Sequence, residues 1–324
     1  MAIVINGSGT VTGISVGGLP DGIVDAGTLA SGAAAAEIGD LSDGATTATS
    51  NIGLGANAVD SITTGDYNVG LGDDALTATT TGSDNTAIGW SAMAINTTGS
   101  QNAAVGYKAL WSNTTASSNA ALGIFALRDN TTASNNTAVG YGSLMVNTTG
   151  AENVGVGASA LAGNTTGTRN VAMGHETLDA NTTGSYNTAI GQRALTTNTT
   201  ANDNTAVGYS ALYNTTGAQN TAVGRSALQE NTTAGENTAV GASAGTATTT
   251  GDVNTFIGSY AGTTNTTGSS NTALGNAALR LATTASYNTA LGREAMKTNT
   301  TGHNNTAVGY QSMFSNTTGN GINT

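Results

Sequence analysis

Residues 187–203 read NTAIGQRALTTNTTAND, and this stretch of 17 residues is the unit from which most of the chain is built. Its opening asparagine recurs every 17 residues from Asn51 to Asn204, and again from Asn220 to Asn305, with a single step of 16 residues between the two series. The chain therefore holds sixteen copies of one unit. A fixed period of this kind indicates a solenoid, in which each copy forms one layer and stacks on its neighbours.

Several positions of the unit hardly vary when the opening asparagine is counted as position 0. Position 4 is glycine in all sixteen copies, positions 12 and 13 are paired threonines, and position 3 is always valine, isoleucine, leucine or methionine. Positions 5, 6, 9, 10, 15 and 16 accept almost any residue. In the short copy we place the missing residue before Asn214, so that Asn214 takes position 11. The residues that we expect to form structural ladders are represented by Asn187, Gly191, Thr199, Thr200, Asn204, Gly208, Asn220 and Gly224.

The residue types of the unit argue against a helix. An invariant glycine, adjacent β-branched threonines and corner asparagines favour short extended segments joined by tight turns. Seventeen residues suit one coil of a parallel β-solenoid, with two strands of about five residues and two turns. Like residues of successive coils would then form ladders about 4.8 Å apart. We expect asparagine ladders to bond amide to amide and threonine ladders to bond hydroxyl to hydroxyl. The predicted fold is all-β.

One irregularity predicts which positions share the interior. Position 8 carries a large apolar residue in fourteen copies, but it is glycine at Gly245 and Gly262. Phe256 is the only bulky residue at position 2, and it lies in the second of these two copies. A ring that fills the space of two missing leucines implies that positions 2 and 8 face one core.

The composition excludes several classes of function. Of the 324 residues, 8 % are charged, whereas an ordinary globular domain has about 25 %. The net charge of −11 argues against binding to nucleic acid or anionic membranes. The absence of cysteine excludes disulfides and thiolate chemistry, and no apolar run reaches the ~18 residues of a membrane helix.

No catalytic, cofactor or metal site is predicted. The two histidines, His175 and His303, occupy variable positions, so we expect both to be exposed. No acid pair recurs at a fixed position of the unit, and neither a phosphate-binding GxxxxGK[ST] loop nor a calcium-binding GGxGxD turn is present. The hypothesis is therefore a protein without enzymatic activity.

The chain divides into two predicted segments. Residues 1–34 contain no copy of the repeat, and we interpret them as a segment that attaches the chain to a virion or cell-surface partner, or caps the solenoid. A cap is expected because an open solenoid end exposes unpaired strand edges. Residues 35–324 form the predicted repeat shaft, which begins with a degenerate copy at 35–50.

The repeat resembles two groups of known proteins. Asn204–Leu212, NTAVGYSAL, and Asn220–Leu228, NTAVGRSAL, resemble the head repeat of YadA-like trimeric adhesins. The alternation of such units with NTTG turns is similar to repeat arrays in bacteriophage tail fibres. The resemblance covers about residues 35–324, and it implies a homotrimer of left-handed parallel β-rolls that forms a fibre on a virion or cell surface. The small residues at positions 2, 4 and 7 are compatible with close approach of a neighbouring chain.

The sequence also departs from the adhesin pattern. The repeat is longer than in YadA-like heads, and no secretion signal, coiled-coil stalk or membrane anchor is evident, while residues 5–24 look like the segments that join phage fibres to the virion. The first hypothesis is therefore a phage tail-fibre shaft for host attachment. The alternative is a bacterial surface adhesin or an extracellular filament protein, which differs in how it is anchored. Whether trimers join end to end into a filament is left open by the sequence. An ice-binding solenoid is disfavoured, because adjacent threonines in a regular strand face opposite sides.

Aromatic residues supply the candidate for ligand contact. Thirteen of the fourteen occupy variable positions, and they concentrate between Asn85 and Glu152. Ladder stacking would align these rings along the shaft. They either pack against a neighbouring chain or rod, or stack on the sugar rings of a surface polysaccharide. The candidate residues are Trp90, Tyr107, Trp111, Phe125, Tyr141 and Met145.

Overall fold

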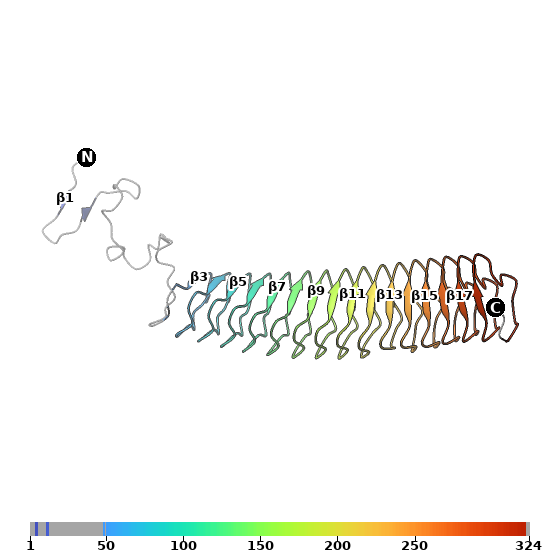
Figure 1. The fold of residues 1–324 in the computed structure, drawn as a ribbon. Coiled ribbons are helices and arrows are strands. Elements are labelled where there is room, and N and C mark those ends of the chain that lie inside the picture. The colour runs from blue at the N-terminus through green and yellow to red at the C-terminus, as the bar shows by residue number, and fades with distance from the viewer. Residues whose placement is uncertain (1–3, 6–10, 13–47, 49, 322–324) are drawn as a thin grey trace. The chain divides into compact units, whose positions relative to one another are not determined.

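A computed structural model of the chain describes residues 4–5, 11–12, 48 and 50–321 (Figure 1). The chain divides into two units, residues 1–41 and 42–324. In the first unit, β1 (Val4–Ile5) and β2 (Val11–Thr12) pair in an antiparallel sheet. Two predicted segments, the attachment or capping segment 1–34 and the degenerate copy at 35–50, lie almost entirely outside the described residues.

The second unit is a β-solenoid with 17-residue coils, each of which contributes one strand to a 16-stranded parallel sheet (Figure 1). The strand order follows the sequence, and like positions pair: Thr188 pairs with Thr205, which pairs with Thr221 across the short copy. The predicted all-β parallel solenoid is confirmed. The strands are β3 (Ile52–Leu54), β4 (Val69–Leu71), β5 (Thr86–Ile88), β6 (Ala103–Val105), β7 (Ala120–Leu122), β8 (Thr137–Val139), β9 (Val154–Val156), β10 (Val171–Met173), β11 (Thr188–Ile190), β12 (Thr205–Val207), β13 (Thr221–Val223), β14 (Thr238–Val240), β15 (Thr255–Ile257), β16 (Thr272–Leu274), β17 (Thr289–Leu291) and β18 (Thr306–Val308).

The prediction of two five-residue strands per coil is wrong, because each coil has a single strand of three residues at positions 1–3. The glycine at position 4 has φ between +120° and +140° in every coil, and positions 6 and 8 are left-handed, as at Ser91 (φ 53°) and Met93 (φ 51°). Left-handed residues interrupt an extended backbone. The segment that follows the strand, which we call the return side of the coil, still bonds to the neighbouring coils. The Ser91 amide donates to the Asp73 carbonyl of the preceding coil at 2.9 Å, and the Met93 amide donates to the Ala109 carbonyl of the following coil at 3.0 Å.

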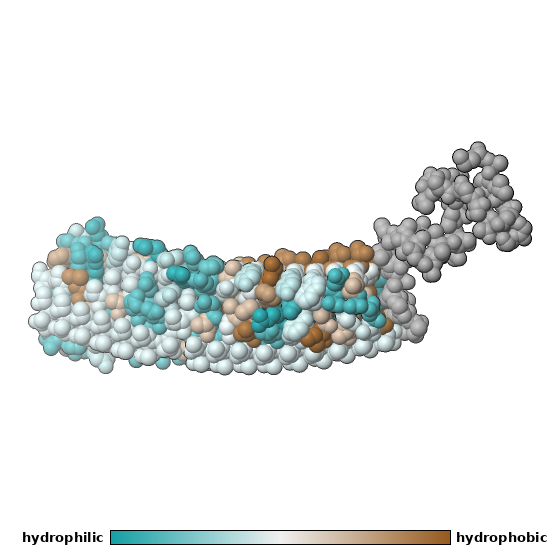
Figure 2. Space-filling view, turned by 180° about the vertical axis from the view of Figure 1, so that it is seen from behind, coloured by the Kyte–Doolittle hydropathy of each residue, from teal (hydrophilic) through white to brown (hydrophobic). Residues whose placement is uncertain are grey.

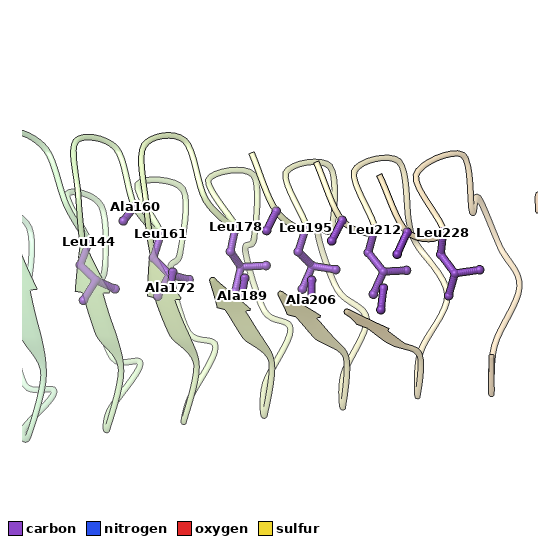
Figure 3. Close-up of a cluster of buried hydrophobic side chains, with 14 of the residues drawn as sticks. Leu144, Ala160, Leu161, Ala172, Leu178, Ala189, Leu195, Ala206, Leu212 and Leu228 are labelled. Carbon is purple, nitrogen blue, oxygen red and sulfur yellow. The ribbon is translucent and has the colours of Figure 1, made fainter. Parts of the chain in front are cut away.

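The core lies between the strand and the return side of each coil. Leucines of position 8 form a file along the axis, surrounded by alanines of positions 2 and 7 (Figure 3). Phe256 is only 1 % exposed, and a Cβ added to Gly245 or Gly262 would lie 2.8 Å or 2.5 Å from its ring. The predicted replacement of two leucines by one ring is confirmed. The alanines of positions 2 and 7 are buried inside their own chain. The expectation that these small residues allow a neighbouring chain to approach is therefore wrong for positions 2 and 7.

The glycines of position 4 allow successive coils to approach closely. A Cβ added to Gly140 would lie 2.6 Å from the carbonyl oxygen of Gly157, its counterpart in the next coil. Gly191 and Gly208 stand in the same relation, with an added Cβ of Gly191 2.8 Å from the backbone of Gly208. Glycine is therefore required both by the backbone conformation and by the contact between coils of the same chain.

Two asparagine ladders run through the interior. At position 0, the Nδ2 of Asn68 donates to the Oδ1 of Asn51 at 3.0 Å and to the Gly82 carbonyl at 2.9 Å. At position 11, the Nδ2 of Asn113 donates to the Oδ1 of Asn96 at 2.8 Å. These side chains are buried, so the bonds satisfy amide groups that have no access to water. The predicted amide-to-amide bonds are present in both ladders. In the first, the Nδ2 groups of Asn187 and Asn220 donate to the Oδ1 of Asn170 and Asn204, whereas Asn204 bonds to the Asn187 Oδ1 through its backbone N–H.

The threonine ladder differs from the predicted one. The Oγ1 of Thr182 donates to the Thr199 carbonyl at 3.0 Å, and the Thr182 amide donates to the same oxygen at 2.8 Å. Hydroxyls of position 12 therefore bond to carbonyls of the next coil and not to other hydroxyls, because a carbonyl oxygen has two lone pairs and can accept both groups. Thr200, at position 13, is exposed.

The alignment of the short copy also needs correction. Thr215 is fully buried and its amide donates to the Leu212 carbonyl, as Asn198 does to Leu195 at position 11 of the preceding coil. Asn214 therefore occupies position 10, and the missing residue belongs to the turn that normally holds the threonine pair. This deletion removes one exposed residue from the turn, so that the buried Thr215 and Gly217 lie two residues apart, whereas Asn198 and Ala201 in the preceding coil lie three apart.

Candidate functional site

An aliphatic side chain points outward from the strand of every coil. Within each strand, position 2 is directed into the core, and positions 1 and 3 are directed away from it. Position 3 is half-buried or exposed throughout; Leu122, for example, is 51 % exposed. We call this set the aliphatic column. Its members are Leu54, Leu71, Ile88, Val105, Leu122, Val139, Val156, Met173, Ile190, Val207, Val223, Val240, Ile257, Leu274, Leu291 and Val308.

The core of the chain does not require these side chains, because they point away from it. Strand propensity explains the β-branched members only, whereas six of the sixteen are leucine or methionine. Single exposed apolar residues are normal on a protein surface, but a contiguous stripe is typical of an interaction surface. The aliphatic column is thus the first candidate functional surface, and it extends over the whole series of strands.

The rings of the predicted aromatic row contact one another from coil to coil. The rings of Trp90 and Tyr107 are stacked, with centroids 5.1 Å apart and planes inclined by 14°. Phe125 meets Tyr107 edge to face at 5.3 Å and meets Tyr141 edge to face at 6.1 Å. Phe125 enters from position 6 and continues the row past Ile124, which holds position 5 of that coil. We call the four rings, Trp90, Tyr107, Phe125 and Tyr141, the aromatic ridge.

Lys108 contacts both the ridge and Trp111. Its Nζ lies 4.8 Å from the ring centroid of Trp111, 5.3 Å from that of Trp90 and 5.9 Å from that of Tyr107. The sequence analysis did not identify Lys108, although its place directly after Tyr107 and three residues before Trp111 could have indicated it. Met145 is half-buried at position 9 of the last ridge coil and takes no part in these ring contacts.

The ridge faces solvent within this chain. Trp90, Tyr107 and Tyr141 are 43 %, 42 % and 58 % exposed. Figure 2 shows hydrophobic residues gathered along one edge of the low-numbered coils, whereas hydrophilic residues occupy that edge in the high-numbered coils. On the face that Figure 2 shows, this edge is therefore more hydrophobic in the low-numbered coils than in the high-numbered coils.

Charged side chains form pairs between neighbouring coils. Arg169 bonds to Glu152 at 2.9 Å and Arg193 bonds to Glu176 at 2.8 Å, and each arginine lowers the pKa of its carboxyl partner. Burial raises the pKa of Asp179, whose Oδ1 has no hydrogen-bond partner among the residues that the structure describes. The two arginine pairs are solvent-exposed, so their contribution to stability is small.

The two histidines differ in their exposure to solvent. His175 is exposed, as expected. His303 is half-buried and its Nδ1 accepts a hydrogen bond from the Ser286 amide at 3.0 Å, so the prediction that this residue is exposed is wrong. Among the residues that the structure describes, no cluster of three or more His, Asp or Glu side chains could hold a metal ion. The described part of the chain also has no helix long and apolar enough to span a membrane.

A scan against protein-family models finds no match, and no curated protein is significantly similar to the chain in sequence. Because no similar protein indicates a function, the function is inferred from the two exposed apolar surfaces, the aliphatic column and the aromatic ridge.

Proposed function

We propose that the chain forms the shaft of a homotrimeric fibre, a phage tail fibre that serves attachment to a host surface and catalyses no reaction. The observation that carries the proposal is the aliphatic column, which presents one outward-facing apolar side chain, half-buried or exposed, in each of sixteen successive coils. Full burial of such a side chain is worth about 1.5–3 kcal/mol. A partner that covers the column along its length would therefore be bound tightly.

The period of the column favours a second copy of the same chain as that partner. A surface that covers the column must present complementary groups at the spacing of the coils, about 4.8 Å, over roughly 75 Å. Identical chains aligned in parallel and in register meet this requirement. Closed cyclic symmetry lets several identical columns meet around one axis, which is the arrangement that the resemblance to trimeric adhesins implies.

Single-cysteine variants test where the copies meet, because the chain has no cysteine of its own. We expect Val139→Cys, on the aliphatic column, to form covalent dimers with a short bifunctional thiol cross-linker. Thr149→Cys, at position 13 of the same coil, is the matched control and should remain monomeric after the same treatment. Efficient cross-linking at residue 149 and none at residue 139 would place the interface elsewhere and contradict the proposal.

A second experiment separates the phage fibre from the bacterial adhesin. Antibodies raised against the shaft should label virions in immunogold electron microscopy, with the label on the tail. Label confined to the surface of uninfected cells would instead support the adhesin, which shares the shaft and differs in how it is anchored.

A further inference from the structure

We propose that the aromatic ridge and Lys108 form a docking platform for an acidic polysaccharide that lies along the shaft. The proposal names a ligand for the fibre proposed above, and only its biological setting rests on that function. The carbohydrate would stack the C–H faces of its sugar rings on the aromatic side chains and place a carboxylate near the Lys108 ammonium.

The confinement of the ridge to four coils argues for a ligand and against a second copy of the chain. Copies aligned in register meet through features that every coil offers, as the aliphatic column does. The ridge occupies positions 5 and 6, which vary elsewhere and read Gln192, Tyr209, Arg225 and Ala242 at position 5 of four later coils. Both tryptophans of the chain, Trp90 and Trp111, belong to this one region. A local departure from the repeat marks a local site.

The rings are held in place before any ligand arrives. The contacts from Trp90 through Tyr107 and Phe125 to Tyr141 restrain each ring against the next. Rigid aromatic side chains lose little conformational entropy on binding, and the polar atoms of tryptophan and tyrosine can bond to hydroxyl groups of a sugar. The ridge therefore has the amphipathic and preorganised character that binding of a hydroxyl-rich ring requires.

Both ends of the ridge are open along the column. Position 5 is Asp73 in the coil before Trp90, and Ala158 in the coil after Tyr141. The Asp73 carboxylate is turned toward the preceding coil, where its Oδ1 accepts a hydrogen bond from the Ala56 amide at 2.9 Å. No large side chain of this column therefore covers the outer side of either terminal ring, so a chain-like ligand can extend past the ridge in both directions.

Lys108 supplies the preference for an acidic ligand. Its ammonium lies among three rings and makes no ion pair with any residue that the structure describes, whereas Arg128 and Lys297 are each paired with an acid. A carboxylate on the ligand would provide the missing partner. Because the whole chain carries a charge of −11, attraction to a polyanion must act at short range here, and binding should weaken as ionic strength rises.

Tryptophan fluorescence of the full chain reports on the proposed platform, because Trp90 belongs to the ridge and Trp111 contacts Lys108, and the chain has no other tryptophan. We expect alginate, a polyuronate, to change the emission saturably, and dextran of matched length to have an affinity at least about tenfold weaker. The alginate response should decrease with added salt. An absent alginate response would overturn the proposal, and an equal response to dextran would overturn the role assigned to Lys108.

Variants that retain both tryptophans locate the binding. Lys108→Gln, and the double variant Tyr107→Ser with Tyr141→Ser, should each weaken alginate binding about tenfold or more. The matched control, Tyr209→Ser with Tyr310→Ser, changes two exposed tyrosines at position 5 outside the ridge and should bind as the wild type does.

The mass of each variant, measured by light scattering, separates this proposal from the proposed function. Weaker alginate binding at unchanged mass supports the docking platform. A ridge variant that lowers the mass would make the ridge an interface between copies and overturn the proposal. A monomeric wild-type chain that still binds alginate would contradict the trimer and leave the docking platform supported.

Discussion

Two stretches of the solenoid, Asn85–Glu152 and Asn187–Val253, share one interior and differ in their outer surface. Both bury large side chains at position 8, such as Leu110 and Leu212, and both contain the asparagine ladder of position 0. The first stretch carries the aromatic ridge, whereas the second carries small, polar or charged residues at most of the corresponding positions. The comparison shows that stacking constrains the interior columns strictly and leaves the outward positions 5 and 6 free to vary from coil to coil.

The largest expected effect comes from position 4, where the two stretches should respond alike. Gly140→Val, in the first, and Gly208→Val, in the second, should each destabilise the chain by at least about 4–5 kcal/mol, because a side chain there is forced to a positive φ and collides with the next coil. Thermal unfolding followed by circular dichroism measures the loss. Gly309→Val, which has no atom within 4 Å of its added Cβ, is the control and should lose less. Unchanged melting temperatures for both interior variants would contradict the shared interior.

The second effect concerns the coils around Phe256, where the core is packed differently. Phe256→Ala should cost about 3–4 kcal/mol, because no leucine of position 8 is present to fill the cavity beside Gly245 and Gly262. Adding Gly245→Leu and Gly262→Leu to this variant should restore most of the lost stability. Both glycines have φ of 59°, close to the 49° that Leu228 adopts at the same position, so leucine fits the backbone. Failure of the triple variant to recover would show that the ring does not substitute for the two leucines.

A smaller gain is expected where the second asparagine ladder is interrupted. Asn231 lies between Thr215 and Thr248, and both polar atoms of its amide are buried without a hydrogen-bond partner in the described part of the chain. Thr248→Asn should provide a donor for the Asn231 Oδ1 and raise the stability by about 1 kcal/mol. Thr200→Asn, on the exposed turn, is the control and should have no such effect. A lower melting temperature for Thr248→Asn would mean that the ladder has no room for a continuous series of amides at this point.

The smallest effect is a dependence on pH at Asp179. Burial raises the pKa of this carboxyl, so its ionised form is less stable in the folded chain than in the unfolded chain. The penalty is present above the folded pKa and disappears as the pH falls through the unfolded pKa. We therefore expect Asp179→Asn to raise the melting temperature at neutral pH and to have a diminishing effect on acidification. An effect that grows on acidification would contradict this account.

The repeat period made much of this interior predictable. The parallel register, the asparagine ladders and the contact of Phe256 with Gly245 and Gly262 all follow from like residues lying above one another. The lengths of the strands did not follow, because left-handed conformations at Ser91 and Met93 belong to residue types that rarely adopt them. Hydrogen bonds to the neighbouring coils hold Ser91 and Met93 in these conformations. These bonds cannot be inferred from the sequence of a single copy of the unit.

The outer surface was predictable only in part. The row from Trp90 to Tyr141 follows from the period. The sequence places Lys108 next to Tyr107, but which rings its ammonium contacts depends on the side-chain conformation. Position 3 was recognised as invariably aliphatic, yet its outward direction required the strand boundaries. The alignment of the short copy was wrong because Asn214 and Thr215 can each occupy position 11, and the contacts between coils select Thr215.

The most direct test of the central claim, that the aliphatic column joins identical chains into a fibre shaft, is the mass of the intact chain in native buffer. Multi-angle light scattering should give about three times the chain mass of 31.6 kDa, and the value should persist on dilution. A particle of 31.6 kDa would show that the aliphatic column stays exposed in solution, and it would contradict the account.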